Sequence, residues 1–123
     1  MKKYDLEERL IDYAVLSIEI VKLLPNNVEG RHLGNQLVKS GTSPSLNYGE
    51  AQSAESRKDF IHKVSIILKE LRESLVCMKI LKKSNLVSDS ALLEEGIKES
   101  NELISIFVKS VKTAQGNMLK LKS

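Results

Sequence analysis

Hydrophobic positions recur every three or four residues along four long stretches of the chain, which is the pattern of helices that bury one face. We predict helices over about residues 5–24, 28–53, 56–83 and 90–113. The connections between them are short, and no sequence repeat or long linker is present. The spacing therefore predicts one all-α domain over residues 1–123, an antiparallel up-down four-helix bundle.

Three features predict where these helices begin and end. Pro25 disfavours helical geometry in the residue before it and should end the first helix at Leu24. Ser56 and Asp59 form a variant capping box that should open the third helix. The fourth helix should begin near Ser90, after the turn over residues 84–89, and the tail beyond Gly116 should fray.

Pro44 lies inside the second predicted helix, where a proline costs about 3 kcal/mol. The hydroxyls of Thr42 and Ser43 can satisfy nearby backbone groups, which favours a kink in a continuous helix. The alternative is a break, with Ser43 as the N-cap and Pro44 as the first residue of a new helix. We favour the kink.

Each of three helices carries a stripe of apolar residues that we expect to form the core. On the first helix the stripe is Leu6, Leu10, Tyr13, Ala14, Ile20, Val21 and Leu24; on the third it is Phe60, Val64, Ile67, Leu68, Leu71, Leu75 and Met78; on the fourth it is Leu93, Ile97, Ile104, Phe107, Val108 and Val111.

Composition narrows the class of protein. Hydrophobic residues make up 41% of the 123-residue chain and charged residues 28%, which suits one folded domain. The lone cysteine excludes an intramolecular disulfide, no apolar run approaches the ~20 residues that span a bilayer, and residues 1–5 lack the apolar region of a signal peptide. We expect a cytoplasmic protein without a membrane role.

Further apolar residues fall outside the predicted core stripes. Exposed apolar clusters usually mark an interface, so we expect a homo-oligomer; ordinary scattered surface residues are the alternative. The candidate interface residues are Ile11, Val15 and Ile18 on the first helix, and Ile66, Val76, Cys77 and Ile80 on the third.

Basic residues share one side of the third helix, and more follow on the fourth. A row of this kind can neutralise nucleic-acid phosphates, although a solvated surface is the common meaning of such a run. Aromatic residues are only 4% of the chain and tryptophan is absent, so we expect binding to the backbone rather than to bases. The candidates are Lys58, Lys69, Arg72, Lys79 and Lys83, with Lys109 and Lys112.

Enzyme signals are weak. Glu29 with His32, and Asp59 with His62, have the carboxylate-x-x-His spacing of di-iron bundles. They begin consecutive antiparallel helices, however, so they should lie at opposite ends, roughly 30 Å apart at 1.5 Å per residue. Cys77 has no catalytic partner in the sequence. We expect no enzyme, no catalytic residue, no metal site and no cofactor.

The central motif resembles a known family. It comprises residues 40–43, Asn47-Tyr48, Glu50-Ala51, Ser56, Asp59-Phe60, Lys63, Ile67 to Glu70 and Glu73-Ser74, preceded by Leu24-Pro25, Glu29, Leu33 and Gln36-Leu37. These residues resemble bacterial four-helix bundle proteins named for open reading frames in 23S ribosomal RNA intervening sequences, also labelled S23 ribosomal proteins.

The resemblance implies an antiparallel four-helix bundle that assembles as a homopentamer. It also implies kinship with the accessory variability protein of diversity-generating retroelements, which binds reverse transcriptase and nucleic acid. Gly49 stands where relatives often carry arginine, which removes one potential phosphate contact, and Val76-Cys77 replaces a common aromatic pair.

Two hypotheses follow for the function. The first is a homo-oligomeric adaptor that binds the backbone of RNA or DNA through its basic helix face. The second is an oligomeric scaffold for a reverse transcriptase or another protein, whose lysines only keep it soluble.

Overall fold

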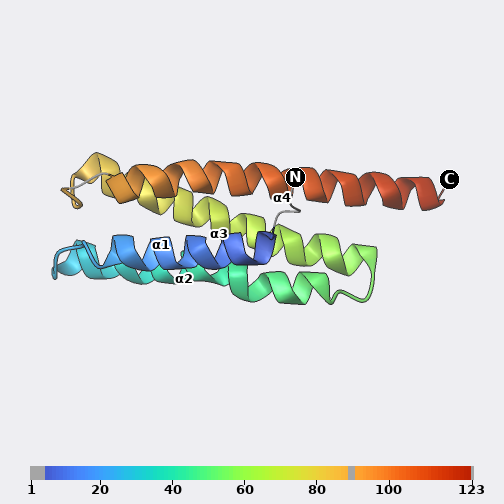
Figure 1. Ribbon diagram of the computed structural model, residues 1–123, viewed down its shortest axis with the longest axis horizontal. Coiled ribbons are helices and arrows are strands. Elements are labelled where there is room, and N and C mark those ends of the chain that lie inside the picture. The colour runs from blue at the N-terminus through green and yellow to red at the C-terminus, as the bar shows by residue number, and fades with distance from the viewer. Residues whose placement is uncertain (1–4, 89–90, 123) are drawn as a thin grey trace.

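The protein folds into four helices, as the hydrophobic spacing predicts. The computed structural model describes residues 5–88 and 91–122, and these residues form no strand. The all-α four-helix class is therefore confirmed (Figure 1). The helices are α1 (Leu6–Val21), α2 (Val28–Gln52), α3 (Arg57–Ser84) and α4 (Ala91–Lys122).

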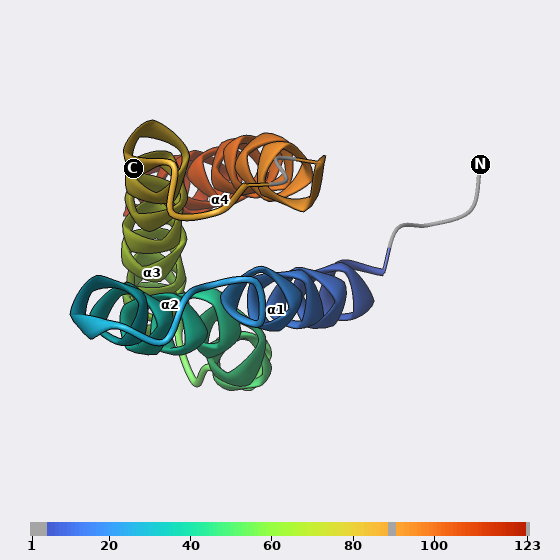
Figure 2. The same cartoon turned by 90° about the vertical axis from the view of Figure 1, so that its left-hand side faces the viewer.

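Each helix packs along the next one in the chain. In Figure 1 the colour along α1 to α4 runs in alternating directions. Seen end-on in Figure 2, α1 and α2 lie side by side in the lower part of the view and α4 lies in the upper part, with α3 reaching from one to the other. Four pairs of helices are in contact, and the contact between α1 and α4 is the sparsest of them. With 32 residues against 16, α4 is also twice as long as α1, so its second half extends past the beginning of α1 (Figure 1).

Side chains cap the helix ends. The Asn27 side chain accepts a hydrogen bond from the backbone N–H of Gly30 at 2.8 Å and starts α2. The Ser56 hydroxyl accepts one from the backbone N–H of Asp59 at 3.0 Å, as the predicted capping box requires. Asn85 ends α3 in the left-handed conformation, with a φ of 58°.

The second helix continues through Pro44. The Thr42 hydroxyl donates to the carbonyl of Val38, and the Ser43 hydroxyl donates to the carbonyl of Lys39, each at 2.6 Å. These side chains therefore bond the backbone in the turn that precedes the proline. The alternative of a new helix beginning at Ser43 and Pro44 is wrong, because α2 is continuous over Val28–Gln52.

The first helix is shorter than predicted. It ends at Val21 rather than Leu24, because the next residues form tighter turns. The backbone N–H groups of Leu23 and Leu24 bond carbonyls only three residues back, at 3.0 Å each.

The fourth helix is longer than predicted. The predicted start at Ser90 lies outside the described residues, and the predicted end at Thr113 is wrong because α4 runs to Lys122. The tail beyond Gly116, which we expected to fray, is helical to Lys122. Apolar spacing continues past Thr113, with Ala114 buried and Met118 half-buried.

The predicted stripes form the core. Six of the seven stripe residues of α3 are buried, and the seventh, Phe60, is half-buried. The stripe predictions miss three buried polar residues, Ser17, Ser74 and Ser100. The Tyr13 hydroxyl lies 2.6 Å from the Oγ atoms of Ser74 and Ser100, so one hydrogen-bonded cluster joins α1, α3 and α4.

The α1 and α2 backbones approach closely at Gly41. A Cβ atom at this position would lie 2.2 Å from the Ser17 Oγ, well inside normal contact. Glycine is therefore required for this helix spacing.

Candidate functional site

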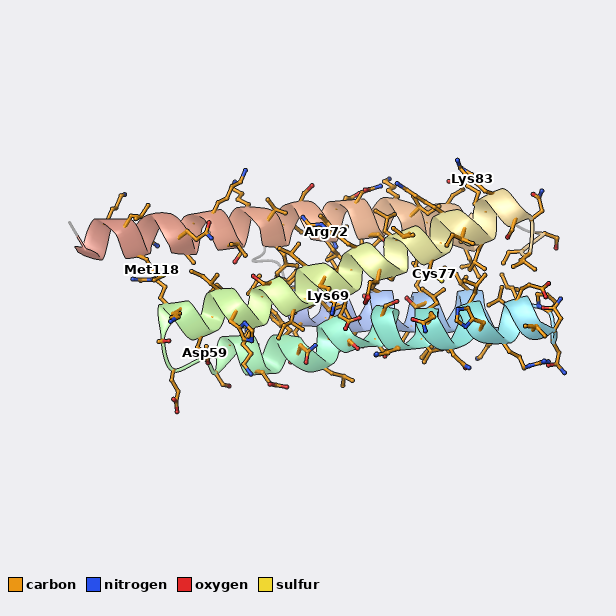
Figure 3. The ribbon with its side chains drawn as sticks, turned by 180° about the vertical axis from the view of Figure 1, so that it is seen from behind. Asp59, Lys69, Arg72, Cys77, Lys83 and Met118 are labelled. Carbon is orange, nitrogen blue, oxygen red and sulfur yellow. The ribbon has the colours of Figure 1, made fainter. Side chains whose placement is uncertain are left out.

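One outer face of α3 carries five exposed basic side chains. The helix begins after Ser56 and runs for 28 residues, so residues spaced along it by near-whole turns share one side. Figure 3 shows Lys69 and Arg72 in its middle and Lys83 toward its C-terminal end. The five exposed residues are Lys58, Lys69, Arg72, Lys79 and Lys83, and Lys109 and Lys112 are exposed on α4.

Three other basic residues, unlike these seven cations, form ion pairs across helices within the described part of the chain. Arg9 bonds both Glu99 and Glu102 across α1 and α4, which raises the pKa of its guanidinium. Lys63 pairs with Glu50 at 3.0 Å, and Lys82 pairs with Glu94 at 2.7 Å. None of the seven candidates forms an ion pair with a residue that the structure describes. Their charge is therefore open to an external anion.

A groove of about 710 Å³ runs between α2 and α3 on this face. It brings together two of the predicted basic residues and three of the predicted interface residues. Its α3 side consists of Lys69, Arg72, Glu73, Val76, Cys77 and Ile80, and its α2 side of His32, Leu33, Gln36 and Ser40.

The apolar groove residues differ in exposure. Val76 is 55% exposed and Ile80 45%, as expected of an interface. The expected exposure of Cys77 is wrong, because its side chain is only 6% exposed and its thiol donates to the Leu33 carbonyl on α2 at 3.5 Å. Burial raises the pKa of the Cys77 thiol to about 11, so the thiol stays protonated and unreactive at neutral pH.

An acidic pair lies beside the groove. Burial, followed by a hydrogen bond with Glu73, raises the pKa of Glu70, while Lys39 and Lys69 act in the opposite direction. The Glu70 Oε1 is buried and has no hydrogen-bond partner among the described residues. Two acidic residues, Glu70 and Glu73, therefore lie among the cations of this part of α3.

A second apolar surface lies on α1, on the side that faces away from the core. Ile11 is 41% exposed, Val15 50% and Ile18 38%, so the predicted exposure of this stripe is confirmed. The remaining interface candidate, Ile66 on α3, is half-buried.

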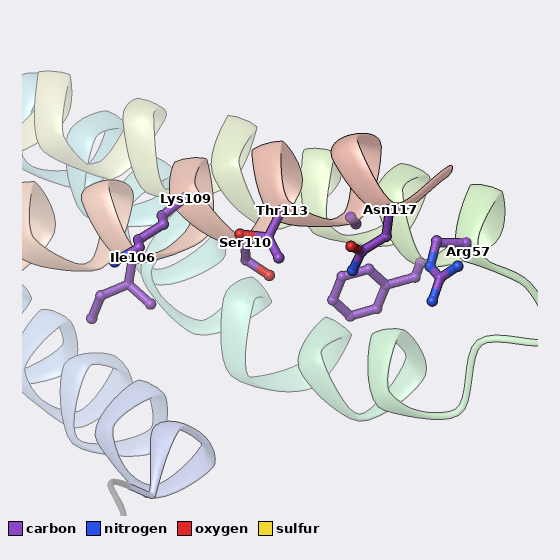
Figure 4. Close-up of a pocket in the computed structure, with 8 residues that line it drawn as sticks. Arg57, Ile106, Lys109, Ser110, Thr113 and Asn117 are labelled. Carbon is purple, nitrogen blue, oxygen red and sulfur yellow. The ribbon is translucent and has the colours of Figure 1, made fainter. Parts of the chain in front are cut away.

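A further groove separates the beginning of α3 from the end of α4. Figure 4 shows Lys109 and Ile106 toward one end of it and Arg57 at the other. Lys112 follows on the same stretch of α4, and Lys58 is next to Arg57 in α3. Of the candidates, Lys109 alone lines this groove. We call Lys58, in the first turn of α3, and Lys109 and Lys112, in the second half of α4, the "end cations", and Lys69, Arg72, Lys79 and Lys83 the "stripe cations". Sequence reasoning missed Arg57, which lines this groove together with Lys109, because its place depends on which helix ends lie together.

The two carboxylate-x-x-His motifs stay apart. His32 is exposed at the α2–α3 groove, whereas His62 is exposed near the start of α3, and Figure 1 shows α2 and α3 beginning at opposite ends. Among the described residues no three histidine, cysteine or acidic side chains are placed to hold a metal ion. Nor does any helix in the described part of the chain have the length and apolarity to cross a membrane.

Comparisons with known proteins identify the family. No curated protein matches the chain. A crystal structure at 1.70 Å resolution of a protein of unknown function from the S23 ribosomal protein family of Bacteroides thetaiotaomicron VPI-5482 is 28% identical, with a TM-score of 0.79. The match covers 88% of this chain and 99% of that one. The family described as 23S rRNA-intervening sequence protein matches residues 2–109. With this match over most of its length, the chain belongs to the 23S rRNA-intervening sequence protein family.

Proposed function

We propose that the protein is a non-enzymatic, homo-oligomeric adaptor that binds the phosphate backbone of RNA or DNA. The observation that carries the proposal is the gathering of seven exposed cations on α3 and the second half of α4, none of which has an ion-pair partner among the described residues; Arg31, Lys39, Arg57 and Lys98 are likewise exposed without an ion pair there. Residues 57–84 contain eight basic and three acidic residues, a net charge of +5 for α3 alone. Phosphate neutralisation of this kind supplies most of the affinity in sequence-independent binding.

The end cations are the sharper test of this proposal. The stripe cations adjoin Val76 and Ile80, so reversing them would also change an apolar surface, whereas Lys58, Lys109 and Lys112 can be changed without touching the α2–α3 groove. Changing these three residues to Glu should weaken binding to a 20-base-pair RNA or DNA duplex by at least about 10-fold. The slope of log affinity against log salt should fall by about three. Fluorescence anisotropy across a salt series measures both.

A matched control separates position from net charge. The variant Lys22→Glu, Lys63→Glu and Lys82→Glu makes the same charge change at lysines that already pair with carboxylates. It should retain most of the affinity. An equal loss in both variants, or no binding by the natural protein at low salt, would count against a localised phosphate-binding surface.

A protein-binding scaffold is the second candidate, and the apolar part of the α2–α3 groove favours it. Val76 and Ile80 stand exposed between cations, an arrangement that a nucleic-acid backbone does not need. If a protein partner is the ligand, Val76→Gln with Ile80→Gln should remove that partner, whereas changing the end cations to Glu should leave it bound.

A further inference from the structure

The exposed face of α1 is apolar along its middle and acidic along its sides. Ile11, Val15 and Ile18 form the apolar stripe, which no other helix among the described residues covers. At 100° per residue, Glu7 falls on one side of this stripe, and Glu8, Asp12 and Glu19 fall on the other. The lone basic residue within α1, Arg9, is bound to Glu99 and Glu102 of α4, and Lys22, which follows the last residue of α1 on this side, pairs with Glu19 at 3.5 Å. We call this face the α1 surface.

The α2–α3 groove has the opposite character. Val76 and Ile80 provide its exposed apolar part, and Lys69 and Arg72 line it next to them. Lys79 and Lys83 continue the positive charge on the same side of α3, while Glu73 is the acidic residue that lines the groove. Val76 lies seven residues, or about two helical turns, after Lys69, which places it within the row of cations.

We propose that the α1 surface of one copy docks into the α2–α3 groove of a second copy. The inference rests on the self-association within the proposed function and names the two surfaces that meet. Each surface supplies an apolar stripe and the charge that the other lacks, which favours the contact and fixes its orientation. Pairing two α1 surfaces would bring acidic rows together, and pairing two grooves would bring cations together, so both like-with-like contacts are disfavoured.

The contact joins different surfaces, so it is heterologous. Each copy offers one α1 surface and one groove, and every addition leaves a free surface at either end. The assembly must therefore close into a ring or continue as a filament, and it does not stop at a two-fold dimer. The end cations lie outside both surfaces and remain available to nucleic acid in the assembly.

Complementation between two variants tests this pairing. Val15→Gln with Ile18→Gln removes apolar side chains from the α1 surface. Val76→Gln with Ile80→Gln does the same in the α2–α3 groove. All four positions are at least 38% exposed, so the fold should survive. Each variant alone should lose self-association and run as a 13.8 kDa monomer. Their mixture keeps one intact pair of surfaces and should give a 1:1 complex of twice that mass that grows no further.

Light scattering after nuclease treatment measures these masses. Leu46→Gln is the control, because Leu46 is 73% exposed on α2 and lies outside both surfaces; it should retain the mass of the natural protein. A natural protein that is itself monomeric would overturn the inference together with the self-association in the proposed function. If the natural protein associates while either variant keeps its mass, or the mixture stays monomeric, only the pairing is wrong.

Discussion

The hydroxyl of Tyr13 connects three helices through two buried serines. It lies 2.6 Å from both Ser74 on α3 and Ser100 on α4, and the ring is only 1% exposed. Ser74 and Ser100 also donate to carbonyls of their own helices, so the hydroxyls form a satisfied cluster. A buried polar cluster of this kind fixes how neighbouring helices align, because any other alignment leaves hydroxyls unpaired.

Tyr13→Phe should therefore lower the free energy of unfolding by about 1–2 kcal/mol, the usual cost of removing one partner from a buried hydrogen bond. Urea denaturation followed by circular dichroism measures the change. Tyr48→Phe is the control, because the half-buried Tyr48 makes a ring contact with Phe107 and its hydroxyl bonds no described residue. Equal losses in the two variants would contradict the role of the hydroxyl cluster.

At the scale of elements, α2 contains two glycines that differ in the space available for a side chain. Gly41 faces Ser17 of α1 so closely that a Cβ would overlap its side chain, whereas a Cβ at Gly49 would meet nothing within 4 Å. Gly41→Ala should destabilise the protein by about 1–3 kcal/mol through forced separation of α1 and α2. Gly49→Ala should stabilise it by up to about 1 kcal/mol, since alanine is the better helix former.

Thermal denaturation of the two alanine variants separates the effect of helix packing from the effect of helix propensity. A lower midpoint for Gly41→Ala beside a raised one for Gly49→Ala is the expected result. Two variants that move in the same direction would show that helix propensity, rather than the α1–α2 distance, governs both sites.

Spacing predicted the elements well because each helix repeats its apolar positions over many turns. The same spacing places the basic row and the exposed apolar residues on one side of α3, since Lys69 and Val76 are seven residues, about two turns, apart. The burial of Cys77 was not predictable from α3 alone, because Leu33 of α2 covers it. The end of α4 was missed because lysines and Gly116 interrupt an apolar spacing that Ala114 and Met118 continue.

The whole molecule is staggered and unevenly charged. Figure 1 shows the last turns of α4 extending past the other helices, and the side chains from residue 115 to 120 are exposed or half-buried. Acidic residues gather on α1 and the first half of α4, whereas basic residues gather on α3 and the second half of α4. The projecting turns depend mainly on helix propensity, because few buried contacts hold them.

Hydrogen exchange should therefore be far faster in residues 115–122 than in residues 92–108 of the same helix. Mass spectrometry of peptides from α4 measures the difference, with peptides from the centre of α3 as the protected reference. Equal protection along α4 would show that the projecting turns are covered in solution.

The contact between Gly41 and Ser17 has a consequence for the shape of an assembly. It sets the distance and tilt between α1, which carries one docking surface, and α2, which forms a wall of the other. Copies joined head to tail rotate by the same amount at every step, so this tilt decides how many copies complete a circle. If the proposed assembly closes into a ring, an added methyl group at residue 41 would thus change the curvature of that ring, and with it the number of subunits, without touching either surface.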